Sequence, residues 1–84
     1  MPIYFFDIDD GDASTRDEEG LELSDEAAAR VAGLACLGEI ASEKIIQRDQ
    51  LTMTLQIRKA DRSILYEASL RLTGAFKQPD RKRS

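Results

Sequence analysis

The clearest pattern in the chain is an alternation of apolar and polar residues in its second half. Apolar side chains occupy every second position from 51 to 57, and the alternation resumes from 64 to 73 after a polar interruption. A period of two is that of a β-strand with one dry face. The pattern therefore predicts a β-hairpin, and the second strand is expected to direct one alternating set of side chains inward: Ile64, Tyr66, Ala68, Leu70 and Leu72.

The N-terminal segment predicts a further strand that runs into a polar turn. Residues 3–8 are mostly β-branched and aromatic, and the run Asp9-Asp10-Gly11-Asp12 then interrupts them. Tyr4, Phe6 and Ile8 are expected to share one face of this strand. Residues 20–23 favour a short returning strand after a long polar loop.

A single long helix is predicted between these strands. Ser24 is a good N-cap, and Asp25 and Glu26 would then lie where the helix dipole favours negative charge, so the helix is expected over residues 25–47. At about 100° per residue, one apolar stripe is expected to lie on the sheet: Ala27, Val31, Leu34, Ala35, Gly38, Ala41 and Ile45.

The predicted helix carries more apolar surface than one sheet would cover. Between residues 27 and 41 only Arg30 and Glu39 are charged, and a helix that is apolar all round is usually covered all round. A second copy of the chain is the expected cover, because a two-fold pair is the commonest homo-oligomer. The interface candidates are Ala29, Ala32, Cys36, Leu37 and Ile40. The alternative is that alanines on a solvated face simply favour helix.

Together these elements predict a small α+β domain of order β-β-α-β-β. Residues 1–74 are expected to form one antiparallel sheet of four strands, with the long helix packed on one face. The apolar sides of both later strands would meet Val31, Leu34 and Ala41. Residues 75–84 form a basic tail that we expect to be disordered.

Composition limits the classes of protein to which the chain can belong. No apolar run among its 84 residues approaches the ~20 residues that cross a membrane, and the first residues lack the basic and apolar regions of a secretion signal. A single cysteine without any histidine makes neither an internal disulfide nor a zinc site. We therefore expect a cytoplasmic protein without a cofactor and without a membrane partner.

Charge is distributed unevenly along the chain. Residues 1–26 hold ten carboxylates and one arginine, a net charge of −9, whereas residues 27–84 hold six carboxylates and eleven basic residues, a net charge of +5. The acidic part could meet a basic partner protein, a second copy or the other half of the chain. Only the basic tail hints at nucleic acid, through Lys77, Arg81, Lys82 and Arg83, and no aromatic-rich basic face supports that interpretation.

The acidic turn resembles a calcium loop in composition but departs from its spacing. Five carboxylates fall within a dozen residues: Asp7, Asp9, Asp10, Asp12 and Glu18. An EF-hand loop needs glycine at its sixth position, whereas Gly11 would stand at the fifth, and Ser14 stands where an aliphatic residue belongs. A solvated acidic turn is the favoured interpretation, and a carboxylate-based metal or ligand site remains the alternative.

The inventory of side chains does not favour catalysis. Without histidine the usual general base and the usual triads are absent. Cys36 stands within the predicted helix without an identifiable activating partner, and the five glycines are too scattered to form a phosphate-binding loop. We expect a protein that is not an enzyme.

The N-terminal block carries a signature that resembles a known family. The pattern consists of Tyr4-Phe5-Phe6, Asp10-Gly11, Asp17-x-Glu19-Gly20, Leu23-x-Asp25 and Ala28-Ala29-Arg30. It is similar to a family of short proteins of unknown function that are abundant in rhizobia and related alphaproteobacteria. Members of that family often carry His where Asp7 stands and Pro where Ser24 stands. The resemblance implies a cytoplasmic bacterial protein and no established activity.

A weaker resemblance is to antitoxins of the HicB type. These also begin with an aromatic strand, an acidic turn with glycine, a short strand and a helix opened by a polar cap, and the likeness implies a dimeric domain that binds a small toxin. The chain differs from them in its single clear hairpin after the helix, and we expect no appended DNA-binding domain. The predicted function is thus a non-enzymatic, homodimeric interaction module with an acidic partner-binding face. The metal or ligand site and the antitoxin remain alternatives.

Overall fold

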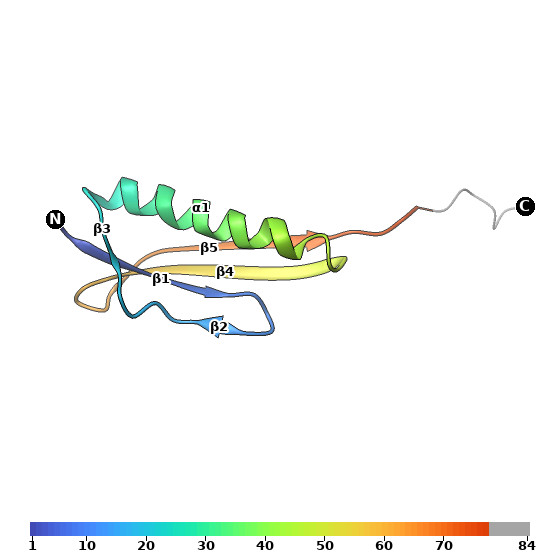
Figure 1. Ribbon diagram of the computed structural model, residues 1–84, viewed down its shortest axis with the longest axis horizontal. Helices are drawn as coiled ribbons and strands as arrows, with labels where there is room; N and C mark the ends of the chain where they lie inside the picture. The colour runs from blue at the N-terminus through green and yellow to red at the C-terminus, as the bar shows by residue number, and fades with distance from the viewer. Residues whose placement is uncertain (78–84) are drawn as a thin grey trace, which may run out of the picture.

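A computed structural model describes residues 1–77 of the chain as one sheet covered on one face by one helix. The elements follow in the order β1 (Ile3–Asp9), β2 (Ser14–Thr15), β3 (Leu21–Glu22), α1 (Glu26–Lys44), β4 (Gln50–Lys59) and β5 (Ile64–Thr73). Figure 1 shows α1 lying along the sheet and residues 74–77 leaving the end of β5. The predicted α+β class is confirmed, with one short strand, β2, that the sequence pattern did not reveal.

All strands of the sheet are antiparallel, and its order is β2-β1-β4-β5. The short strand β3 pairs with β1 on the same side as β2 but at the opposite end, with Tyr4 opposite Leu21. The predicted hairpin is the pair β4–β5, whose register runs from Gln50 opposite Thr73 to Arg58 opposite Ile64. The outer border of β1 is thus shared by two short strands, whereas β5 forms the other border.

The core lies between α1 and the covered face of the sheet. Its fully buried large side chains all come from β4: Met53, Leu55 and Ile57. Tyr4 and Ile8 are buried on β1, and Phe6 packs against the same cluster, so the predicted shared face of β1 is confirmed. Gly33 lets the helix approach closely, because a Cβ there would lie 2.8 Å from Ile57 Cδ1.

The helix begins and ends one to three residues from the predicted limits. Its N-cap is Asp25 rather than Ser24, with an extended backbone and a carboxylate that accepts a hydrogen bond from Ala28 N at 2.8 Å. Both residue types cap helices well. Asp25 is the cap because its backbone is extended and the first helical residue is Glu26. At the other end the α-helix finishes at Lys44, and residues 45–47 form a turn.

The predicted sheet-facing stripe of the helix is wrong at most of its positions, although Ala41 is buried as predicted. The buried positions of α1 are Ala29, Gly33, Leu37 and Ala41. Val31, expected against the sheet, is 63% exposed, and Ile45 is 43% exposed. Leu34 lies at the border and packs against the core from one side. Because only Arg30 and Glu39 are charged between residues 27 and 41, periodicity alone did not distinguish the two orientations.

A β-bulge corrects the predicted facing of residues at the start of β5. The register passes from Ile57 opposite Tyr66 to Arg58 opposite Ile64, which leaves Leu65 as an extra residue. An extra residue reverses the alternation beyond it. Ile64, expected inward, is 48% exposed, whereas Leu65, expected outward, packs against the core. Leu70, also expected inward, is 41% exposed, because α1 lies mainly over β4 rather than over this border strand.

Candidate functional site

The strongest polar cluster of the molecule joins the acidic N-terminal block to strand β4. Arg58 Nε donates to Asp7 Oδ2 at 2.7 Å, and Arg58 Nη2 donates to Asp7 Oδ1 at 3.0 Å. The same Nη2 also donates to the carbonyl oxygen of Asp17 at 2.7 Å. The guanidinium carbon lies 5.1 Å from the centre of the Phe5 ring. Arg58 is buried, so this bidentate pair is held in a partly desolvated place.

Asp17 completes the cluster by accepting a backbone hydrogen bond on the side of β1 that faces away from β4. Its Oδ2 accepts a hydrogen bond from Phe6 N at 3.1 Å, between the ends of β2 and β3. Its Oδ1 accepts from Glu19 N at 3.1 Å and Gly20 N at 3.2 Å. Gly20 has a φ of +77°, and a Cβ there would lie 2.6 Å from Ile3 Cγ2. The Asp17-x-Glu19-Gly20 signature therefore folds the loop back over β1.

The ionisation of these carboxylates follows from their donors. The hydrogen bonds from Arg58 are the main cause that lowers the pKa of Asp7, against the opposing effect of burial. Burial acts to raise the pKa of Asp17, but the backbone N–H donors of Phe6, Gly20 and Glu19 together lower it. The hydrogen bond from Lys44 lowers the pKa of Asp10 well below its usual range. All three side chains are therefore anions at neutral pH, as their structural roles require.

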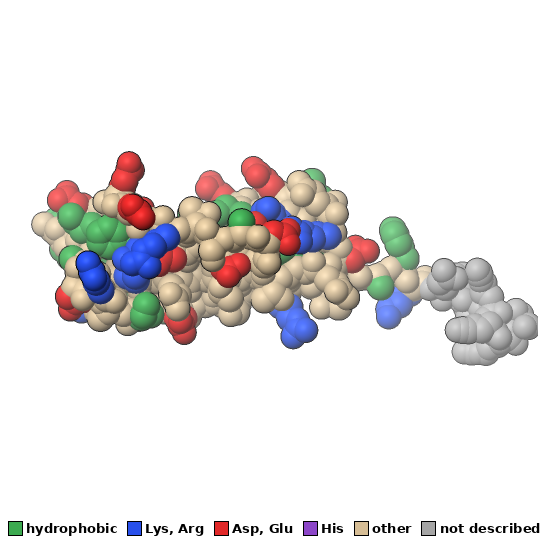
Figure 2. All heavy atoms as spheres, turned by 90° about the horizontal axis from the view of Figure 1, so that it is seen from below, with side chains coloured by type: hydrophobic (Ala, Val, Ile, Leu, Met, Phe, Trp, Pro, Cys, Tyr) green, Lys and Arg blue, Asp and Glu red, His purple; other side chains and the backbone are tan. Residues whose placement is uncertain are grey.

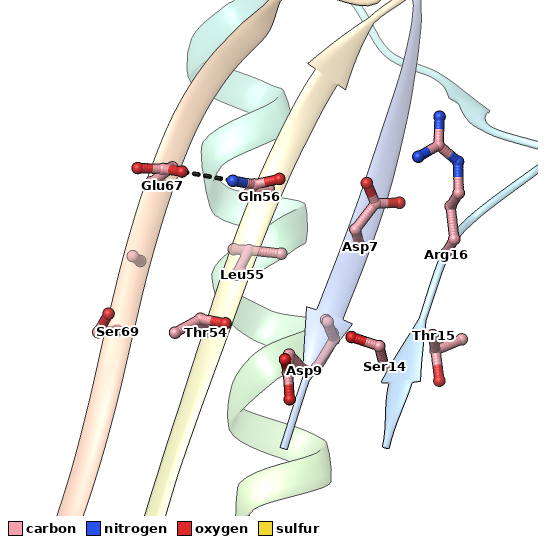
Figure 3. A pocket seen from close by; sticks show the side chains of 12 residues that line it. Asp7, Asp9, Ser14, Thr15, Arg16, Thr54, Leu55, Gln56, Glu67 and Ser69 are labelled. Atoms are coloured by element: carbon pink, nitrogen blue, oxygen red, sulfur yellow. Dashed lines mark hydrogen bonds between the residues drawn. The ribbon is translucent and has the colours of Figure 1, made fainter. Parts of the chain in front are cut away.

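The uncovered face of the sheet carries an open polar hollow. Figure 3 shows Asp7, Asp9, Thr54, Gln56, Glu67 and Ser69 along three neighbouring strands, with α1 behind the sheet. The hollow measures about 540 Å³ and reaches from Arg16 and the β2 residues to the outer strand β5. A hydrogen bond from Gln56 Nε2 to Glu67 crosses it. Figure 2 shows Lys or Arg and Asp or Glu side chains interspersed on the face seen from below, without a patch of one sign.

A second hollow, here called the edge groove, lies between α1 and the loop that joins β1 to β3. Its volume is about 570 Å³, and its lining is mostly apolar, with Phe6, Ile8, Leu21, Cys36 and Ile40 among the residues. Its border is acidic and includes Asp10, Asp17, Glu18 and Glu19, with Arg16 as the one basic residue among the described residues that line it. The edge groove is the place where the acidic block meets exposed apolar surface.

The candidate metal ligands are not brought together by the fold. Asp7 and Asp9 line the open polar hollow, whereas Asp10 and Glu18 line the edge groove. Asp10 pairs with Lys44 at 2.8 Å, and Asp12 pairs with Arg48 at 2.6 Å. Within residues 1–77 no group of three or more His, Cys, Asp or Glu side chains is arranged to hold a metal ion. Four of the five candidates instead accept hydrogen bonds from backbone N–H groups or basic side chains of their own chain: Asp7, Asp9, Asp10 and Asp12.

The five interface candidates on the helix divide into two groups. Ala29 and Leu37 are buried against the sheet, with exposed fractions of 0% and 4%, which corrects their expected place at an interface with a second copy. Cys36 is exposed, and Cys36 and Ile40 line the edge groove. Ala32 is half-buried. Of the predicted basic tail, Lys77 is exposed, and Arg81, Lys82 and Arg83 lie outside the described residues.

Comparison with known proteins identifies the family. A family model described as a domain of unknown function, DUF6894, matches residues 3–71, which run from β1 into β5. The chain belongs to the DUF6894 family. No curated protein and no solved structure matches this DUF6894 chain. The expected membership of a family of unknown function is thereby supported, and the family name brings no activity to the domain.

The site residues that sequence reasoning missed are those that act on the backbone. Asp17 and Arg58 were not among the candidates, although they bind Asp7 and position the loop of the DUF6894 domain. Asp17 falls within the family signature, which was the available signal. Arg58 is one of the polar residues that alternate with apolar residues in β4. The pattern did not distinguish it from an arginine exposed to solvent. Within residues 1–77 no helix has both the length and the apolar character that a membrane crossing needs.

Proposed function

We propose that this DUF6894 domain is a non-enzymatic, homodimeric interaction module that binds a basic partner protein in the edge groove. The observation that carries the proposal is the combination of an apolar floor with an acidic border at one place. A partner segment with apolar side chains on one face and Lys or Arg beside them matches both features. A helix or strand of this kind would bury Ile40 and cover Cys36.

The charges that border the edge groove differ in their availability to a partner. Asp10 and Asp17 already serve Lys44 and the loop backbone. Glu18 and Glu19 are exposed, and neither side chain has a salt bridge within the described residues. These two glutamates are therefore the side chains that we assign to a basic partner.

The test uses peptides and the single cysteine of the chain. A panel of amphipathic helical peptides with Leu on one face and Lys or Arg on the other is titrated by calorimetry, alongside matched peptides with Glu in place of the basic residues. Binding of basic peptides, slower alkylation of Cys36 in their presence and weaker binding at high salt are expected. Absence of binding by every basic peptide would reject the edge groove as a partner site.

Charge reversal supplies the matched control. The double variant Glu18→Lys and Glu19→Lys should weaken binding of the basic peptides at least about tenfold, because two attractions become repulsions. Glu39→Lys makes the same type of change at an exposed helix position that does not line the edge groove. It should leave the affinity within about twofold. Equal losses in both variants would indicate a general charge effect and count against the assigned site.

The two alternatives differ in what supports them. A small basic toxin would be a partner of the proposed chemistry, and co-purification with a co-expressed toxin from a neighbouring gene would favour the antitoxin interpretation over other partners. A carboxylate-based metal or ligand site has less support, because the candidate ligands lie on two faces. A rise in melting temperature with millimolar Ca²⁺ or Mg²⁺ would favour it.

A further inference from the structure

The two borders of the sheet differ in whether their outer backbone groups have hydrogen-bond partners. On β1 the outer backbone groups meet β2 at Ile8 and β3 at Tyr4, and the carboxylate of Asp17 accepts from Phe6 N between them. On β5 no strand or loop within residues 1–77 pairs with the outer side, because the sheet order ends there. A strand of ten residues is a long border to leave unpaired.

The direction of the backbone groups on β5 follows from the hairpin register. Gly74 N donates to Asp49 O at 2.7 Å, next to the pair Gln50–Thr73. Hydrogen-bonding direction alternates along an antiparallel strand. The N–H and C=O groups of Glu67, Ser69, Arg71 and Thr73 therefore point away from β4, toward the outside of the sheet.

The side chains of β5 complement those of β5 in a second chain when the two strands pair antiparallel in one particular register. When Ser69 stands opposite Ser69 of a second chain, Glu67 stands opposite Arg71 on the uncovered face, and the same pair recurs on the other side of the axis. On the helix-covered face, Tyr66 then stands opposite Leu72, and the small Ala68 stands opposite Leu70. Opposite charges and aromatic–aliphatic pairs directly across two strands are stabilising combinations.

We propose that β5 is the interface of a homodimer in which two copies pair antiparallel about an axis at Ser69, forming one continuous sheet through both chains. In this register the outward groups of Glu67, Ser69 and Arg71 all find backbone partners. The pairing also covers Leu70, which is 41% exposed in the single chain. This inference rests on the homodimer of the proposed function and specifies where its two copies meet.

Strand pairing rather than helix contact holds this dimer together. Helix α1 lies mainly over β4, and adjacent strands are spaced by about 4.8 Å. Two copies related by the axis at Ser69 then have helix axes about 14 Å apart, wider than the ~8–10 Å of directly packed helices. Val31, although 63% exposed, is therefore not a main contact of the dimer.

A charge swap tests the register directly. Sedimentation equilibrium of the full chain should give a dimer in the micromolar range. Glu67→Arg or Arg71→Glu alone should raise the dimer Kd at least about tenfold, because each places like charges opposite one another twice. The double variant carrying both changes should restore the dimer, since the opposite charges face one another again. Circular dichroism and melting temperature check that each variant is folded.

Two further variants separate this interface from others. In a Cys36→Ser background, Ser69→Cys should form an intermolecular disulfide under mild oxidation, because paired Cα atoms across such a contact lie about 5.5 Å apart, within disulfide range. Arg71→Cys should cross-link far less. Ile40→Glu should leave the dimer intact, because this residue lines the edge groove on the other side of the helix.

The outcomes distinguish the inference from the proposal on which it rests. A wild-type chain that stays monomeric at high micromolar concentration would overturn both the homodimer and this interface. A wild-type dimer that survives both single charge reversals, or that dissociates with Ile40→Glu, would overturn the β5 interface alone. Failure of the double swap to restore the dimer would overturn the register centred on Ser69.

Discussion

At the scale of single residues, Arg58 does the most to connect distant parts of the chain. It reaches Asp7 on β1 and the Asp17 carbonyl in the following loop, while stacking near Phe5. Removing one member of a desolvated pair leaves the other without compensation. Arg58 thus joins two parts of the acidic N-terminal block, strand β1 and the loop at Asp17, to strand β4.

Replacing Arg58 by methionine should be strongly destabilising. Arg58→Met preserves much of the side-chain volume but leaves the half-buried carboxylate of Asp7 without its ion-pair partner, with only Asp17 N still donating to it. The free energy of unfolding should therefore fall by about 2–4 kcal/mol. Arg48→Met removes the exposed pair with Asp12 and should cost at most about 1 kcal/mol. Urea denaturation of both variants measures the difference, and similar costs would contradict the assigned role of Arg58.

The lowered pKa values of Asp7 and Asp17 predict acid sensitivity with a definite sign. Both carboxyls have a lower pKa in the folded chain than the usual 3.8. Their contribution to stability is therefore fully present above about pH 4 and is lost as the pH falls from there through the folded-state values. Denaturation curves between pH 2 and 7 should show this loss below pH 4, and Asp17→Asn should make it shallower. An unchanged slope in Asp17→Asn would contradict the role of the carboxylate.

At the scale of elements, the positions of the three long strands were predictable from the sequence, whereas strand β2 and the orientation of the helix were not. The apolar residues of β4 all lie on one side of the strand, so the alternation predicted which face of β4 is buried: the face of Leu51, Met53, Leu55 and Ile57. The helix offers apolar residues on every side, and its orientation depends instead on Gly33. Only a residue without a side chain fits so close to Ile57, a condition that appears only once both elements are placed.

The two helical glycines should respond to substitution with opposite signs. Gly33→Val places new atoms against Ile57, Leu55 and Phe6 and should destabilise the domain by about 1–3 kcal/mol. Gly38→Ala has no atom within 4 Å of the new Cβ and should stabilise the helix by about 0.5–1 kcal/mol. Thermal and urea denaturation measure both. A stabilising Gly33→Val would place the helix differently on the sheet.

At the scale of the whole molecule, the uneven charge of the sequence is largely used within the fold. Asp7, Asp10, Asp12 and Glu26 each pair with a basic residue from the second part of the chain. The sequence left three possible counterparts for the acidic part: a basic partner protein, a second copy or the other half of the chain. Ion pairs within the chain use much of the uneven charge. The groove and the bulge at Leu65 could not be predicted, because both depend on how loops and strands meet in space.

Reversing one of these long-range charges should give a salt-dependent loss of stability. Lys44→Glu sets a carboxylate beside Asp10, where the ion pair at 2.8 Å now joins the helix end to the acidic turn. The melting temperature should fall at low salt and recover partly in 0.5 M NaCl, because salt screens exposed charges. Glu43→Lys, a neighbouring change without a salt bridge in the described residues, is the control. A loss that is independent of salt would point to packing instead.

The carboxylate that closes the border of β1 also limits how far such a sheet can extend. A sheet with two bare borders can add copies without end, which is the geometry of a fibril. Here Asp17, with β2 and β3, occupies one border, so a chain that joins a neighbour through β5 has no second long strand to offer. In the proposed β5 dimer, growth would therefore stop after one addition, and Asp17 would help to separate a finite assembly from an open-ended one.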